Sequence, residues 1–125
     1  MADVEFDELL AMSDMISLHV PLTTETESLI DEESISRMRK GVWLINTSRG
    51  GLIDEEALLA GLESGQVGAA ALDVFRREPP RSGYPLLSQP NVILGSHNGS
   101  NTDEAAQRAT RLAVANLIAG LTGET

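Results

Sequence analysis

The chain has 125 residues, no cysteine and a formal net charge of −10, because 19 acidic residues outnumber nine lysines and arginines. Its length predicts one domain with a modest core. The small number of basic residues argues against binding to nucleic acid or anionic membranes, and the lack of cysteine excludes disulfides and thiolate metal sites. No apolar run is long enough to span a bilayer, and the acidic N-terminus is unlike a signal peptide. We therefore expect a soluble cytoplasmic protein.

Helical and strand-like segments alternate along the chain. In order, the predicted elements are a helix at Phe6–Met12, a strand at Met15–Val20, a helix at Asp31–Met38, a strand at Val42–Asn46, a helix at Asp54–Glu63, a strand at Val67–Val74, a loop at Phe75–Pro90, a strand at Asn91–Gly95 and a long helix at Asn101–Gly120. Asp31 and Asp54 are expected to cap two helices and Gly65 to end the second of them. Asn101 and Glu104 fit a capping box for the last helix.

This alternation predicts an α/β fold with about four parallel strands, joined by right-handed crossovers and flanked by helices. The apolar run Val42–Ile45 is typical of a strand buried on both faces. The strand at Val67–Val74 is rich in alanine and glycine, so we expect a helix to pack closely on it. No internal repeat or linker divides the chain.

The last helix has an unusually broad apolar arc. On a helical wheel, about half of the circumference is apolar. The residues of this arc are Ala105, Ala106, Ala109, Leu112, Ala113, Val114, Leu117 and Leu121. Such a helix either contacts more than one surface, part of which lies outside this chain, or lies flat on one face of the sheet.

Each predicted strand ends in, or is followed by, a side chain with useful chemistry. His19 ends the first strand, Arg49 follows the second, Asp73 ends the third and His97 follows the fourth. The carboxyl ends of parallel strands meet at one edge of the sheet, where open α/β sheets bind ligands. Glu78, on the loop that leaves the third strand, can reach the same edge.

These residue types suit the anchoring of an anionic substrate coupled to proton transfer. The Arg49 guanidinium offers a planar fork of donors for a carboxylate or phosphate, and Gly50 and Gly51 would permit a sharp turn and the close approach of a ligand. A histidine backed by a carboxylate is a general acid or base near neutral pH. Structural alternatives remain: Arg49 pairing with a nearby acid, a structural histidine, or acids at turns and in solvent. The spacing predicts no metal site.

Four blocks of sequence resemble a known family. They are residues 13–23 (SDMISLHVPLT), residues 38–51 (MRKGVWLINTSRGG), residues 68–75 with Glu78-Pro79, and residues 90–94 leading to His97. The blocks occur in the family's order and cover nearly the whole chain. On these residues the chain resembles the NAD-binding domain of the D-isomer-specific 2-hydroxyacid dehydrogenases, the group that includes D-3-phosphoglycerate dehydrogenase.

The resemblance implies a partial Rossmann-type, doubly wound sheet and NAD as cofactor. It implies that Arg49 binds the carboxylate of a small 2-hydroxy or 2-oxo acid. It further implies that His97 exchanges a proton with the substrate oxygen, and that Glu78 pairs with that histidine. The implied cofactor-binding residues are His19, Val20, Pro21, Thr47, Ser48, Arg49, Asp73, His97 and Gly99.

Two departures from the family pattern affect this expectation. Gly95-Ser96 stands where the family commonly has Thr-Pro before the catalytic histidine. No Gly-x-Gly-x-x-Gly follows a strand, so we expect residues 1–125 to be the second half of a dinucleotide-binding domain plus a C-terminal helix, without the glycine-rich half or the substrate domain. Such a chain should be nearly inactive alone, and its parent a homo-oligomer such as a dimer.

The sequence leaves room for other functions and does not identify the substrate. One alternative is a non-catalytic dehydrogenase relic that self-associates through an unpaired sheet edge. A receiver-like signalling domain is disfavoured because the only lysine, Lys40, precedes a strand. The identity of the acid is also open, since Arg76, Arg77 and Arg81 would favour a second negative charge on the substrate only if they are not simply solvated.

Overall fold

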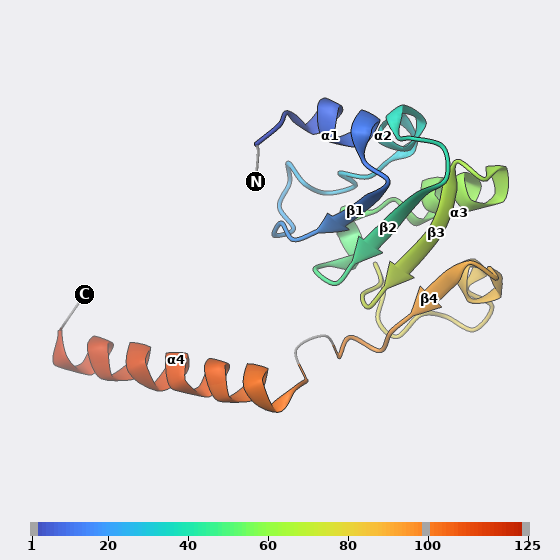
Figure 1. Ribbon diagram of the computed structural model, residues 1–125. Coiled ribbons are helices and arrows are strands. Elements are labelled where there is room, and N and C mark those ends of the chain that lie inside the picture. The colour runs from blue at the N-terminus through green and yellow to red at the C-terminus, as the bar shows by residue number, and fades with distance from the viewer. Residues whose placement is uncertain (1–2, 99–100, 124–125) are drawn as a thin grey trace.

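A computed structural model describes residues 3–98 and 101–123. Within them, four parallel strands form one sheet in the order β1-β2-β3-β4 (Figure 1). The elements are α1 (Phe6–Met12), β1 (Met15–Leu18), α2 (Glu32–Arg37), β2 (Val42–Asn46), η1 (Gly50–Leu52), α3 (Glu55–Ser64), β3 (Val67–Leu72), η2 (Pro85–Ser88), β4 (Val92–Leu94) and α4 (Asp103–Thr122). The predicted α/β architecture with a four-stranded parallel sheet and a long last helix is confirmed.

Three strands are shorter than predicted, and the reason lies in their pairing. β2 ends at Asn46, which lies opposite Leu18 of β1 and Leu72 of β3. Beyond Asn46, β1 and β3 have no β2 residue to pair with. Each of these two strands therefore ends two residues before its predicted end. β4 likewise covers only Val92–Leu94. His19 and Asp73 therefore lie just past the strand ends instead of within them.

The helix ends follow their capping residues. Asp31 and Ser34 form a capping box at α2, and Asp54 accepts the N–H groups of Glu56 and Ala57 at α3. Gly65 ends α3 with a φ of 73°, a left-handed conformation that favours glycine.

The expected cap of the last helix was wrong. Thr102, not Asn101, accepts the N–H of Ala105, at 3.1 Å. A helix that starts there still has Asp103 and Glu104 in its first turn, at the positive end of the helix dipole. The helix ends at Thr122, two residues later than predicted, because Gly123 supplies the left-handed cap.

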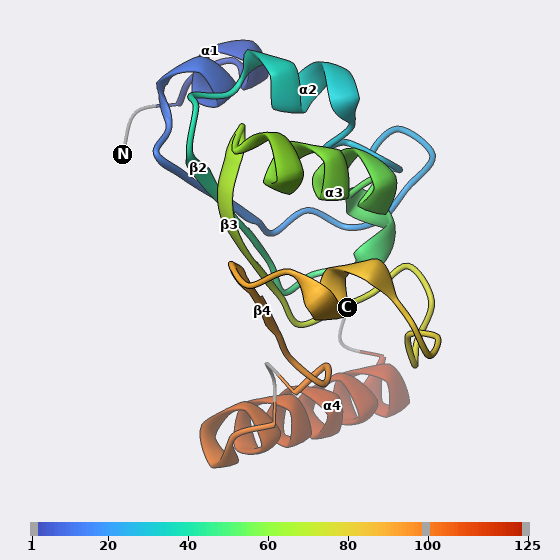
Figure 2. The same cartoon turned by 90° about the vertical axis from the view of Figure 1, so that its right-hand side faces the viewer.

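The core lies on one side of the sheet, where α1, α2 and α3 cover it (Figure 2). Leu44 of β2 and Leu58 of α3 are fully buried there. A helix packs closely on β3, as predicted from the small residues of that strand. At the closest point Gly61 of α3 lies against Val67, and a Cβ on this glycine would lie 2.9 Å from the valine side chain. The prediction that β2 is buried on both faces was wrong, because no described helix covers the opposite face and Trp43 is 53% exposed.

The last helix stands apart from the sheet (Figure 1). None of its residues is buried, and Leu117 and Leu121 of the apolar arc are 63% and 78% exposed. The alternative that it lies flat on one face of the sheet is therefore wrong in this structure. The other alternative, that the apolar arc contacts a surface that is not part of this chain, stays a prediction. No helix among the described residues is long and apolar enough to cross a membrane.

Candidate functional site

The turn after β2 is built by a buried asparagine. The side chain of Asn46 is 1% exposed, and both of its polar ends are used. Its Nδ2 donates to the Arg49 carbonyl at 2.9 Å, and its Oδ1 accepts the Ser48 N–H at 3.0 Å. These two bonds fold the chain so that Arg49 lies beyond the sheet edge. We assigned no role to Asn46 from the sequence, although an asparagine that ends an apolar run is a recognisable turn signal.

Close packing against two neighbouring segments fixes this turn further. The Ser48 hydroxyl donates to the Leu18 carbonyl at 2.8 Å, which ties the turn to β1. A Cβ on Gly50 would lie only 1.9 Å from the carbonyl carbon of Phe75, so this position requires glycine. The close approach that we expected for a ligand at Gly50 is made by the Phe75 backbone.

His97 and Glu78 are hydrogen-bonded as the resemblance implied. His97 Nδ1 lies 2.7 Å from Glu78 Oε2, and Glu78 Oε1 accepts the Phe75 N–H at 3.1 Å. The Phe75 ring in turn packs edge-on against Tyr84, with centroids 5.8 Å apart. The carboxylate is thus held by its own loop. Because no described residue hydrogen-bonds to His97 Nε2, this nitrogen is available to another partner.

Arg49 lines the same pocket as Glu78 and His97, together with Leu22 and Phe75. One guanidinium nitrogen donates to the Ser48 carbonyl at 2.7 Å. Arg49 makes no ion pair within 4.0 Å among the described residues, which disfavours the alternative that it serves only as the partner of an acid. The pocket therefore combines two arginines, one histidine and one carboxylate at the carboxyl edge of the sheet. The second arginine, Arg76, is already bonded to the Ser28 hydroxyl at 2.7 Å and lies 3.8 Å from the Glu27 carboxylate.

The pKa of Glu78 is below its ordinary value of 4.5. The main cause is the hydrogen bond from His97, followed by that from the Phe75 backbone, and the positive charge of Arg49 contributes less. Since the folded state favours the ionised carboxylate, this group stabilises the fold above its ordinary pKa. The stabilisation is lost as the pH falls through the lowered value.

We therefore expect the Glu78 carboxyl to titrate below pH 4.5 in the wild-type chain and at higher pH in His97→Ala, which removes the hydrogen bond. Carbon-13 NMR of the labelled carboxyl groups measures both. Glu25 is a matched control, because its pKa is also lowered, but by the Thr23 hydroxyl. An unchanged Glu78 titration in His97→Ala would show that the histidine is not the cause.

The other predicted cofactor-binding residues lie at the same sheet edge but outside this pocket. His19 Nε2 lies 2.8 Å from the Ser17 hydroxyl, and Val20, Pro21 and Thr47 are exposed beyond β1 and β2. Asp73 accepts the Asn98 N–H at 3.2 Å. Gly99, also predicted to bind cofactor, lies outside the described residues.

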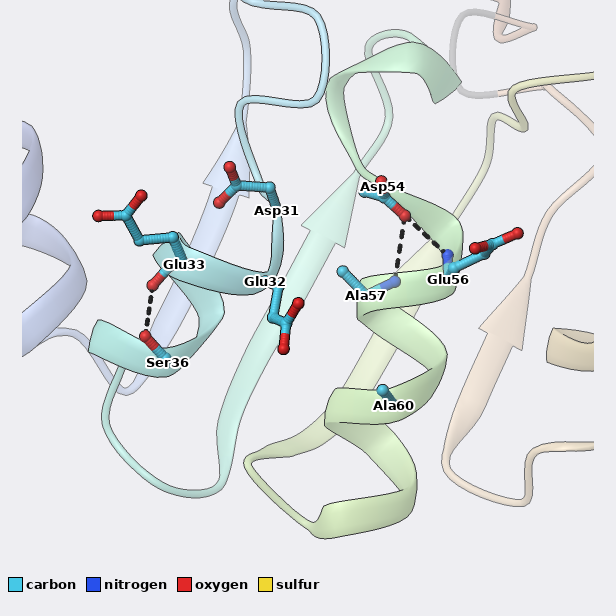
Figure 3. Close-up of a pocket in the computed structure, with 8 residues that line it drawn as sticks. All are labelled: Asp31, Glu32, Glu33, Ser36, Asp54, Glu56, Ala57 and Ala60. Atoms are coloured by element: carbon cyan, nitrogen blue, oxygen red, sulfur yellow. Dashed lines mark hydrogen bonds between the residues drawn. The ribbon is translucent and has the colours of Figure 1, made fainter.

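A second pocket lies between the amino ends of α2 and α3 (Figure 3). It shares no residue with the Arg49 pocket, and its lining carries the carboxylates of Asp31, Glu32, Glu33, Asp54 and Glu56. Two of these, on Asp31 and Asp54, cap the helices. A groove of this charge is unsuited to an anionic substrate.

Comparisons with known proteins show the family of this chain. The family model described as "D-isomer specific 2-hydroxyacid dehydrogenase, NAD binding domain" matches residues 1–99. A glyoxylate reductase of Thermofilum pendens is 50% identical over 120 residues, which is 96% of this chain and 35% of the relative. A D-3-phosphoglycerate dehydrogenase of Bacillus subtilis is 51% identical over 100 residues, which is 80% of this chain and 19% of the relative. The chain thus spans about a third or less of these relatives.

Solved structures show the same fold. The D-isomer specific 2-hydroxyacid dehydrogenase of Xanthobacter autotrophicus, in complex with NADPH, superposes with a TM-score of 0.88 at 35% identity, covering 96% of this chain and 49% of that one. D-2-hydroxyisocaproate dehydrogenase superposes with a TM-score of 0.87 at 32% identity, covering 98% of this chain and 41% of that one. The chain belongs to the family of NAD-binding domains of the D-isomer specific 2-hydroxyacid dehydrogenases.

Proposed function

We propose that this chain is the second half of the dinucleotide-binding domain, with its C-terminal helix, of an NAD-dependent dehydrogenase that interconverts a 2-hydroxy acid and a 2-oxo acid. The observation that carries the proposal is the single pocket lined by Arg49, Glu78 and His97, with the histidine bonded to the carboxylate at 2.7 Å. Family membership supports the same reaction class.

Arg49 is the proposed anchor for the substrate carboxylate. A guanidinium has five N–H donors in a plane, and the Ser48 carbonyl occupies only one nitrogen. The remaining donors can form two parallel bonds with a carboxylate, which fixes the orientation of the adjacent carbonyl as well as the position of the charge. Leu22 and Phe75 provide apolar surface in the same pocket.

His97 is the proposed proton carrier. Its Nδ1 is engaged by Glu78, so Nε2 is the nitrogen that would donate a proton to the oxo oxygen during reduction and remove the hydroxyl proton during oxidation. The Glu78 carboxylate fixes the ring, as in other histidine–carboxylate pairs. Because the Phe75 N–H holds the second carboxylate oxygen, the ring orientation is set by the protein and not by the substrate.

The carboxyl edge of the sheet suits a nicotinamide dinucleotide. Val20 and Pro21 expose apolar surface beyond β1, and the exposed Thr47 supplies a hydroxyl beyond β2. These residues, with His19, Ser48, Arg49, Asp73 and His97, are proposed to hold the cofactor. Gly99, outside the described residues, is proposed to bind the cofactor as well. When bound, NAD(H) supplies or accepts the hydride.

The chain alone is expected to turn over very slowly, because it spans about a third of the relatives that carry the complete reaction. A chimera tests the function directly: this chain replaces its matching segment in the Thermofilum pendens glyoxylate reductase. We expect the chimera to oxidise NADH with glyoxylate, and the isolated chain to show almost no turnover. A folded chimera that binds NADH without turnover would contradict the proposed reaction, and rapid turnover by the isolated chain would contradict its dependence on the rest of the enzyme.

We also propose that the parent enzyme is a homo-oligomer. The sheet face that no described helix covers exposes Met15, Trp43 and Ile93 at 53%, 53% and 74%, and such apolar surface favours association. Sedimentation velocity of the chimera over a range of concentrations tests this, and a monomer at every concentration would contradict it.

A further inference from the structure

The segment that carries His97 is held against Asp73 by its backbone. Gly95 N–H donates to the Leu72 carbonyl at 2.7 Å, immediately before Asp73, and the Asn98 N–H donates to the Asp73 carboxylate at 3.2 Å. His97 lies between these two contacts with a φ of 61°. A non-glycine residue rarely adopts this left-handed conformation, so contacts on both sides must stabilise it.

Gly95 is what lets the carboxylate reach this segment. A Cβ on Gly95 would lie 2.1 Å from Asp73 Oδ1 and 3.1 Å from Asp73 Cα. Any side chain at position 95 would therefore displace the carboxylate or the backbone.

We propose that Asp73 is a positioning residue for His97, acting through the backbone of residues 95–98, and that Gly95 is required for this role. The Asp73 carboxylate holds Asn98, the residue after the histidine, while Glu78 holds the imidazole itself. The backbone and the ring of His97 are thus fixed by two different carboxylates. This role is separate from any contact of Asp73 with cofactor, and it rests on the proposed role of His97.

Two substitutions should release the segment and two should not. Asp73→Ala removes the acceptor, and Gly95→Ala pushes the carboxylate away from Asn98. Asp73→Asn keeps an oxygen acceptor and should rescue the contact. Gly120→Ala is the matched glycine control, because no atom lies within 4 Å of a Cβ built there and its φ is not positive.

The measurements are NMR experiments on the full chain without cofactor. We expect amide hydrogen exchange at Asn98 to rise about tenfold in Asp73→Ala and Gly95→Ala, and to stay within about twofold of wild type in Asp73→Asn and Gly120→Ala. Nitrogen-15 labelling of the two histidines gives a second measurement. The His97 Nδ1 signal should move toward its position in Glu78→Ala in the first pair of variants only.

Wild-type exchange and an unmoved Nδ1 signal in Asp73→Ala would overturn the proposal, as would equal disruption by Asp73→Asn. If Asp73→Ala fails to fold, Gly95→Ala decides: wild-type behaviour at Asn98 and His97 in that variant overturns it. Because these measurements need no substrate, an inactive chimera would count against the proposed function and leave this result standing.

Discussion

Replacing Arg49 with lysine in the chimera should lower kcat/KM for the oxo acid by about a hundredfold or more, a larger loss than the loss of affinity for NADH. Lysine keeps the positive charge, but its ammonium cannot form two parallel bonds with a carboxylate. The substrate would lose its fixed orientation as well as binding energy, so we expect KM to rise and kcat to fall together. Steady-state kinetics and an NADH titration separate the two effects.

Arg77→Lys is the matched control for this change. Arg77 is also exposed, but it does not line the pocket of Arg49, Glu78 and His97. This variant should keep kcat/KM within about twofold of the unmodified chimera, because surface substitutions away from a site have small effects. Equal activity in Arg49→Lys and Arg77→Lys would show that Arg49 does not bind the substrate.

Replacing His97 with glutamine should lower kcat by a factor of about 10²–10⁴, the usual contribution of a positioned general acid or base. Glutamine has a similar reach and can still hydrogen-bond to Glu78, but it cannot carry the proton. Binding of the oxo acid by Arg49 should persist, so KM should change much less than kcat. A rate within about tenfold of the unmodified chimera would mean that another group transfers the proton.

Glu78→Gln is the second variant in this series and separates charge from geometry. The amide still offers one oxygen and a donor to the imidazole, but it carries no negative charge. We expect a smaller loss of kcat than for His97→Gln. A larger loss would indicate that the carboxylate, and not the histidine, contacts the reacting atoms.

The order of the elements could be predicted from sequence because local signals and tertiary packing agree. Asp54 and Gly65 set the ends of α3 to within a residue, and both of their roles are local in sequence. The strand ends were less accurate because they depend on a partner. β1 and β3 end where Asn46 turns away from both, and neither strand's own sequence contains that information.

Burial could not be predicted from the apolar pattern of β2. Trp43 and Leu44 are adjacent apolar residues, yet one is 53% exposed and the other is fully buried. The difference is set by which face of the sheet α1–α3 cover. Likewise, the apolar arc of α4 predicts that the helix packs against another surface, but the sequence of the helix does not indicate which surface that is.

The meeting of Arg49, Glu78 and His97 was predictable because parallel strands bring their carboxyl ends to one edge. The support behind these residues was not. Asn46 is buried and shapes the Arg49 turn, and Gly50 packs on the Phe75 backbone. These contacts join residues of different strands and loops, so they emerge only once the sheet is assembled.

The most direct test of the proposed site is a crystal structure of the chimera with NADH and oxamate, a stable acid with a carbonyl next to its carboxylate. We predict that the oxamate carboxylate forms two hydrogen bonds with the Arg49 guanidinium and that its carbonyl oxygen faces His97 Nε2. Oxamate bound at another position, with Arg49 still bonded only to the Ser48 carbonyl, would contradict the assignment of this pocket as the substrate site.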